Sequence, residues 1–237
     1  MEAKKSAFKR MSGILGFDVK FFSKNFSWLM ASSVFQMLFG LAVSVVLARL
    51  ASKQAFGEYN FLISVITILS IVSIPGLNTS VFKSASEGKD ATFLKAFRLM
   101  LLWSLLGIPI IFGLGLYYSS IGSRLIAICL FSAALFFPLY YPTQLWVHFL
   151  QGKEKFSQFA RYNIISNALR TAAILAAIFI SRGSIVAAFL TFFFSNIIVS
   201  LYIHSKVAKL VSNDKLDKRW KERGYNLILP APFQPVL

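Results

Sequence analysis

The sequence has few of the residues that form disulfides, metal sites and acid–base centres. It has one cysteine, Cys129, two histidines, His148 and His204, and nine Asp and Glu residues in 237. A single cysteine excludes an internal disulfide and a cysteine-based zinc site, and the histidines form no metal-binding motif. We therefore expect neither a bound metal nor another cofactor.

Charged residues are scarce as well, and apolar residues dominate. Only 14% of the residues are charged and 57% are hydrophobic, whereas a soluble domain has about 25% charged residues. A soluble chain of this size would leave large apolar patches against water. The composition therefore predicts an integral membrane protein that is surrounded by membrane lipids.

Long apolar runs recur along the chain. A helix needs about 20 mainly apolar residues to cross the hydrocarbon core, and in lipid only helices or closed barrels satisfy their backbone groups. The runs are too long and too evenly apolar for barrel strands, which alternate in polarity. We predict an all-α, polytopic membrane helical bundle with about six transmembrane helices, in the runs Ser27–Leu50, Tyr59–Val81, Ala96–Tyr117, Leu125–His148, Tyr162–Ile180 and Ser184–His204.

Lys and Arg are distributed unevenly between the loops, and they accumulate on the cytoplasmic side of membrane proteins. Of the 25 basic residues, 20 fall on the side of both termini and only four on the other side: Arg49, Lys53, Arg124 and Arg182. The net charge of +16 is thus divided between membrane loops, and we do not expect nucleic-acid binding. We predict a multi-pass protein of the cell inner (plasma) membrane with cytoplasmic N- and C-termini.

This distribution divides the chain into three parts. Residues 1–25 form a basic cytoplasmic arm, residues 26–206 the six-helix transmembrane lobe, and residues 207–237 a basic cytoplasmic tail. The stretch from Tyr225 to Pro232 is typical of a seventh helix that begins and then stops, because three prolines, at 230, 232 and 235, disfavour a further helix. On this interpretation the chain is one lobe, and a second lobe or a homo-oligomer completes it.

Prolines also lie inside the apolar runs, at Pro75, Pro109, Pro138 and Pro142. Each removes a backbone donor and tends to kink its helix. Kinked helices suit a protein that changes shape around a cavity, although proline is common in membrane helices generally. Both interpretations stay open.

Polar residues follow single helical faces in three of the runs. They are Ser33, Gln36, Gly40 and Ser44 in the first run, Asn60, Ser64 and Thr67 in the second, and Asn163, Asn167 and Arg170 in the fifth. Small and polar residues can hold membrane helices together, and this is the simpler explanation of the Ser and Gly positions. For the Asn-Asn-Arg stripe we favour a water-filled cavity.

Arg170 carries the argument for a cavity. It lies near the centre of its run, about 13 Å from either end at 1.5 Å per residue, and an arginine there costs roughly 2.5–3.5 kcal/mol on insertion scales. No acidic residue lies deep in the six runs, and Glu58, at one edge of the second, is the nearest exception. Because a guanidinium fork matches phosphate, we predict that Arg170 binds an anionic ligand.

The missing carboxylates also bear on mechanism. Proton relays in transporters usually need Asp, Glu or His within the membrane, and an enzyme that handles a diphosphate lipid usually needs acidic residues to hold magnesium. No loop is large enough for a soluble catalytic domain. We therefore do not expect an enzyme.

The order of several short motifs resembles a known family. The first run ends in Val46-Leu47-Ala48-Arg49-Leu50. The second run opens with Phe56-Gly57-Glu58-Tyr59-Asn60 and ends in Pro75-Gly76-Leu77-Asn78-Thr79-Ser80. The fourth run is followed by Leu150-Gln151-Gly152-Lys153-Glu154-Lys155-Phe156. Over roughly residues 20–210 the chain resembles the polysaccharide-export, or lipid-linked oligosaccharide flippase, family. That family belongs to the superfamily that also contains multidrug exporters.

This resemblance implies a carrier of polyprenyl-diphosphate-linked oligosaccharide for polysaccharide biosynthesis, such as that of lipopolysaccharide O-antigen. Members have two similar helical lobes around a cationic cavity, so this chain corresponds to the N-terminal lobe. The substrate-binding residues would be Arg170, Asn167, Asn163, Arg49 and Gln36. Two alternatives stay open, a multidrug exporter of the same superfamily and a membrane enzyme of polysaccharide assembly.

Overall fold

The computed structural model describes residues 19–209 and residue 211, and within them every regular element is a helix. The elements are α2 (Val19–Leu50), α3 (Lys53–Leu69), η1 (Ser70–Ser73), α4 (Gly76–Ser86), α5 (Ala91–Ser104), α6 (Gly107–Ser120), α7 (Arg124–Tyr140), η2 (Pro142–Leu145), α8 (Trp146–Gly152), α9 (Phe156–Ile180) and α10 (Ile185–Ala208). The all-α class is confirmed. Most of the predicted arm (1–25) and tail (207–237) lies outside the described residues.

Six helical segments are long and apolar enough to cross a membrane, in agreement with the six predicted runs. They are Asn25–Leu50, Lys53–Ser73, Ala91–Ser120, Arg124–Gly152, Phe156–Ile180 and Ile185–Ala208. Large apolar side chains face outward along them, for example Ile180 (85% exposed), Ile71 (73%) and Met37 (72%). Such an apolar surface is stable against lipid and unfavourable against water. The chain is therefore a multi-pass membrane protein.

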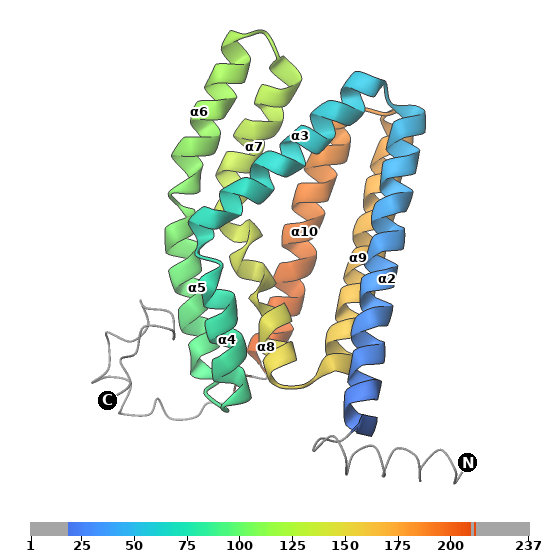
Figure 1. The fold of residues 1–237 in the computed structure, drawn as a ribbon. Coiled ribbons are helices and arrows are strands. Elements are labelled where there is room, and N and C mark those ends of the chain that lie inside the picture. The colour runs from blue at the N-terminus through green and yellow to red at the C-terminus, as the bar shows by residue number, and fades with distance from the viewer. Residues whose placement is uncertain (1–18, 210, 212–237) are drawn as a thin grey trace.

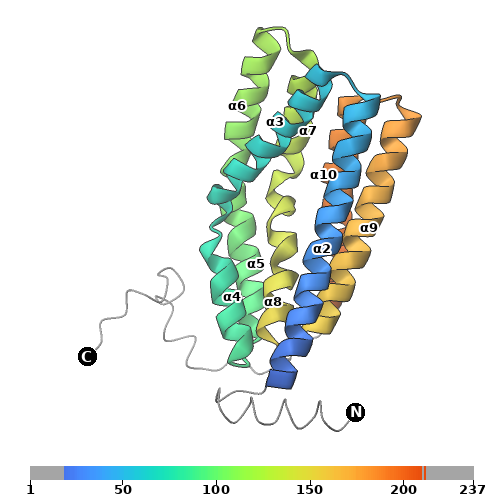
Figure 2. The same cartoon turned by 45° about the vertical axis from the view of Figure 1, so that its right-hand side comes forward.

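The helices form an elongated bundle in which α2 and α9 run side by side and α10 packs against α9 (Figures 1 and 2). α3 crosses the bundle obliquely and continues into η1, which contacts α5, and α6 and α7 form a hairpin on the side away from α2 and α9. The first residues of α2 and the last of α10 lie at the same end. We call this the proximal end. The opposite end, where the α2–α3, α6–α7 and α9–α10 connections lie, is the distal end.

Three of the predicted runs are not single continuous helices, and prolines explain two of the three breaks. Pro75 precedes α4, and Ile74 before it adopts a left-handed backbone (φ 51°). Pro142 begins η2, where its missing N–H is not needed. Pro109 is the third residue of α6, just after α5 ends at Ser104. Of these four prolines only Pro138 lies beyond the first turn of an α-helix, α7, so the prolines mainly set helix boundaries rather than kinks.

The interior divides into two apolar clusters, one toward each end. The distal cluster includes Leu47, Leu62, Phe137, Ile178 and Phe193. The proximal cluster includes Val81, Phe93, Trp146, Phe149 and Val207. Every α-helix from α3 to α10 contributes to at least one cluster, and α9 and α10 contribute to both because they run from one end of the bundle to the other.

The predicted topology has a direct test. We expect a membrane-impermeant thiol reagent to label a cysteine at exposed Ser119, at the distal end, in intact cells, and not one at exposed Ser86, near the proximal end. The background is Cys129→Ala, since this cysteine is fully buried. Labelling after cell lysis controls for reactivity. The reverse pattern would overturn the predicted orientation of the termini.

Candidate functional site

A layer of buried and half-buried polar side chains separates the two apolar clusters. On α9, Ile174 and Ile178 belong to the distal cluster, and Phe159 and Ala160 belong to the proximal cluster. Asn163, Ser166, Asn167 and Arg170 lie between these positions on the same helix. Ser200 on α10 lies likewise between Ile197 and Ile203. The polar layer therefore crosses the bundle at mid-height.

The first half of this layer joins α9 to α2. The Asn163 amide nitrogen donates a hydrogen bond to Ser32 Oγ at 2.6 Å, and Ser32 is only 2% exposed. The Asn167 amide nitrogen donates to the backbone carbonyl and to the side-chain oxygen of Asn163, at 2.8 and 3.0 Å. Both predicted asparagines thus lie together, and they form a continuous polar contact between two helices.

The second half joins α9 to α10 through Arg170. Its Nη2 donates to Ser200 Oγ at 2.9 Å, and Ser200 Oγ in turn lies 3.5 Å from Asn196 Oδ1. Ser200 is fully buried and Asn196 is 5% exposed. Arg170 also interacts electrostatically with the buried Tyr140 of α7. Among the described residues, the guanidinium is therefore held in place by neutral groups.

The position of Arg170 is unusual for a cation. It lies ten residues before the end of α9 at Ile180, or about 15 Å at 1.5 Å per residue. Among the described residues no carboxylate forms an ion pair with it, and its buried Nε has no hydrogen-bond partner. A buried donor without a partner is costly in a membrane interior. An acceptor supplied by an anionic ligand would remove that cost.

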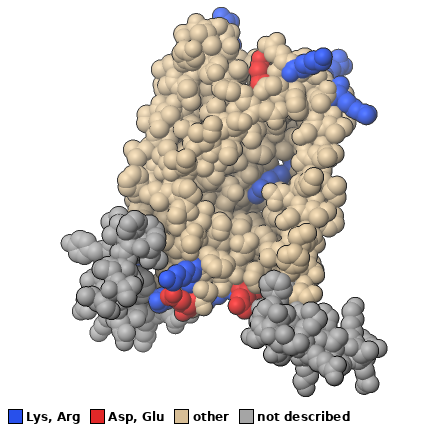
Figure 3. Space-filling model, in the orientation of Figure 1, with Lys and Arg blue, Asp and Glu red and all other residues tan. Residues whose placement is uncertain are grey.

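One face of the bundle is hollowed beside these helices. Figure 3 shows basic side chains at both ends of the molecule, and further basic atoms in a recess between the ends. Acidic atoms appear on this face only near the two ends. The middle of the recess is therefore positive, which suits an anion.

The other two predicted substrate-binding residues lie apart from this cluster. Gln36 is exposed on α2, one turn beyond Ser32, and no hydrogen bond joins it to α9 in the part of the chain that the structure describes. Arg49 is exposed at the distal end of α2, 17 residues after Ser32, which is about 25 Å along the helix. The structure thus brings together Asn163, Asn167 and Arg170 but not Arg49.

The predicted polar faces of α2 and α3 point away from the core. Ser33, Gln36, Gly40 and Ser44 on α2, and Asn60, Ser64 and Thr67 on α3, are all exposed. The three α3 residues bond to their own helix, for example Ser64 Oγ to the Asn60 carbonyl oxygen at 2.8 Å. These stripes therefore face outward from this lobe, and the helix-packing interpretation of the α2 Ser and Gly positions stays a prediction.

Sequence reasoning missed four members of the polar layer: Ser32, Tyr140, Asn196 and Ser200. Asn196 and Ser200 carried a signal, because they are spaced by one helical turn in a mainly apolar run. Ser32 carried none, since it stands beside Ser33 and only the packing of α2 on α9 distinguishes the two. Tyr140 carried no signal either, because several other aromatic residues stand near it in the sequence.

Comparison with known proteins identifies the family. A model of the family described as "polysaccharide biosynthesis protein" matches residues 22–220. No significant match was found among curated proteins or among solved structures. The family match covers most of the chain and all six membrane-spanning segments, and it confirms the resemblance that the short motifs indicate. The chain therefore belongs to the polysaccharide biosynthesis protein family.

Proposed function

We propose that this chain is a lobe of a flippase that moves polyprenyl-diphosphate-linked oligosaccharide across the plasma membrane, as required for O-antigen or a related polysaccharide. The observation that carries the proposal is Arg170, a mid-membrane cation with neutral neighbours and an unpartnered Nε. A diphosphate supplies several acceptor oxygens and negative charge. The family match supports the connection with polysaccharide biosynthesis.

The neighbours of Arg170 suit this role. Asn167 and Asn163 extend a line of amide groups from Arg170 toward the proximal end, along the same face of α9. Neutral amides can bond to a phosphate or to a sugar without fixing the ligand through a second charge. A carrier must bind its cargo and also release it, and a single guanidinium among amides meets both requirements better than a cluster of cations.

A second lobe is part of the proposal. The exposed polar side chains of α2, Ser33, Gln36 and Ser44, would be unfavourable against lipid, whereas the polar side chains of α3 are partly satisfied by their own helix. A second lobe, from another copy of this chain or from another polypeptide, would cover these stripes and enclose the recess beside Arg170. The lipid-facing tail of the substrate could then leave through the seam between the lobes.

Reconstitution tests both parts. Vesicles containing the purified protein should move a fluorescent polyprenyl-diphosphate sugar between leaflets, measured by its protection from an impermeant quencher. Cysteines at Ser64 and Ser44 should cross-link between lobes, whereas a control cysteine at Leu135, which is 69% exposed on α7, should not. Absence of any movement in a cross-linkable assembly would refute the flippase. Movement by a chain shown to be monomeric would refute the second lobe.

A further inference from the structure

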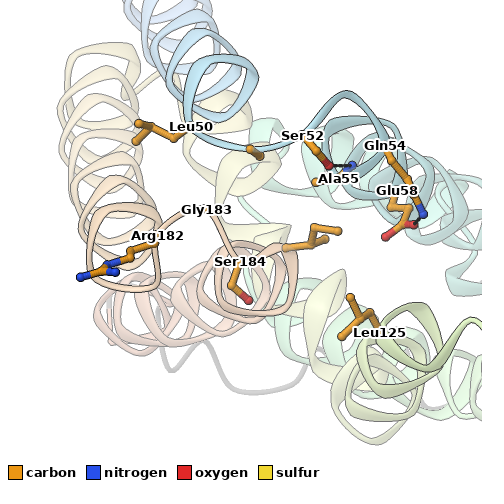
Figure 4. A pocket seen from close by; sticks show the side chains of 11 residues that line it. Leu50, Ser52, Gln54, Ala55, Glu58, Leu125, Arg182, Gly183 and Ser184 are labelled. Carbon is orange, nitrogen blue, oxygen red and sulfur yellow. Dashed lines mark hydrogen bonds between the residues drawn. The ribbon is translucent and has the colours of Figure 1, made fainter.

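The distal end holds an open cavity that the preceding proposal does not use. It has a volume of about 370 Å³ and lies between the α2–α3 connection, the start of α7 and the α9–α10 connection (Figure 4). This volume is at the lower end of the range for small-molecule sites. It is much larger than a metal ion needs, and it is separated from Arg170 by about 15 Å of α9.

The cavity contains the one carboxylate of the six membrane-spanning segments, Glu58. In Figure 4 this side chain turns toward the open space, and the Gln54 amide nitrogen donates a hydrogen bond of 2.8 Å to its Oε1. Gln54 therefore orients the carboxylate, while Oε2 has no hydrogen-bond or ion-pair partner among the described residues. Arg182 also borders the cavity, but its side chain points away from it.

The remaining wall is mixed in character. Leu50, Leu125 and Ile185 supply apolar surface, and Ser52 and Ser184 supply hydroxyl groups. A sugar has the same mixed character, with hydroxyl groups around its edge and C–H groups on its ring faces. A negatively charged Glu58 would accept hydrogen bonds from sugar hydroxyls, and it would repel a phosphate.

The wall at the α9–α10 connection is closely packed. Gly183 has a φ of 88°, and a Cβ atom there would lie 2.6 Å from the backbone oxygen of Leu50. The neighbouring Arg182 also has a positive φ, of 52°. The two connections that flank the cavity are thus in direct contact, so this part of its wall is fixed by backbone.

From these observations we infer that the distal cavity is a binding site for an uncharged sugar residue of the transported oligosaccharide, with the Glu58 carboxylate as its main hydrogen-bond acceptor. This inference rests on the proposed function, because it assigns the two chemical parts of one substrate to two places. The diphosphate lies at Arg170, and the sugars extend along α9 to the cavity, a distance that an oligosaccharide of several sugars covers.

The test measures binding of free sugars to the purified full-length protein. Methyl glycosides of glucose, galactose and N-acetylglucosamine are used as probes, with saturation-transfer NMR as the readout. We expect at least one to bind, and we expect Glu58→Gln and Gln54→Ala to bind it at least tenfold more weakly. Glu154→Gln is the control, since this carboxylate is exposed at the opposite end of the bundle, and it should bind as the parent does.

A second measurement covers weak binding. In the Cys129→Ala background, the probe should slow alkylation of a cysteine at Ser184, in the cavity wall, but not of one at Ser119, on α6 outside it. No binding and no protection with any of the three sugars would overturn the inference. So would unchanged binding by Glu58→Gln, or Glu58-dependent binding of Na⁺ in the absence of sugar binding. In those cases, substrate movement that depends on Arg170 would still support the proposed flippase, so the failure of this inference is distinguishable from the failure of the proposed function.

Discussion

Replacing Arg170 by alanine should reduce substrate movement by at least a hundredfold per folded molecule, while the protein still enters the membrane. The guanidinium is the one cation in the polar layer, and its Nε has no hydrogen-bond partner in the part of the chain that the structure describes. Removing a central charge makes insertion easier, because an arginine there costs roughly 2.5–3.5 kcal/mol. Movement is measured in reconstituted two-lobe assemblies and divided by the amount of folded protein.

Two further variants distinguish a ligand role from a structural one. Arg170→Lys should keep part of the activity, because the charge stays and the bidentate fork is lost. Ser200→Ala removes the hydrogen bond between α9 and α10, which in membrane proteins contributes about 0.6 kcal/mol on average, and it should keep most of the activity. Arg161→Ala, on the exposed first part of the same helix, is the control.

The outcome that contradicts a ligand role is also specific. If Arg170 only joined two helices, Arg170→Ala would lower the melting temperature and the protein yield, and normalised movement would equal that of the parent. Ser200→Ala would then reproduce the defect in stability, since it breaks the same contact from the other side. Equal normalised movement would remove the main support for diphosphate binding.

Gly152→Ala should be the most destabilising small substitution at the proximal end. A Cβ atom at this position would lie 2.3 Å from the backbone oxygen of Phe82 and 2.9 Å from Ala85 Cβ. The clash with a carbonyl oxygen cannot be relieved by a side-chain rotation, so α4 and α8 would have to separate. Overpacking typically costs 1–3 kcal/mol and occasionally more, and we expect about 3 kcal/mol here.

Thermal unfolding in detergent checks this, with two matched variants. Gly113→Ala on α6 has no atom within 4 Å of its new Cβ and should be neutral or slightly stabilising, because alanine favours a helix over glycine. Gly107→Ala clashes with the Phe137 ring at 2.2 Å, so Phe137→Leu should relieve it in part. A melting temperature of Gly152→Ala equal to that of the parent would contradict the close approach of α4 and α8.

The Gly152 contact also gives a physical meaning to one of the motifs that indicated the family. In the run Leu150-Gln151-Gly152-Lys153, the glycine permits helix contact and Lys153 forms an ion pair with the buried Asp90 of the α4–α5 connection. The motif therefore joins two proximal connections. It is a packing motif, and it says nothing directly about the substrate.

The sequence by itself determined the class of the protein, the six spans and the family. These properties follow from composition, from the length of the apolar runs and from short motifs, all of which are local along the chain. The alignment of Asn163, Asn167 and Arg170 could also be predicted, because helical periodicity alone places them on one face of α9.

Only the tertiary structure decided what these residues contact. Helical periodicity could not show that Ser32, and not its neighbour Ser33, faces α9, since that depends on how α2 is rotated about its own axis. Nor could it separate Arg49 from Arg170, because that separation is a distance between points on two packed helices. The distal cavity around Glu58 joins connections that are about 130 residues apart in the chain, and only their packing brings them together.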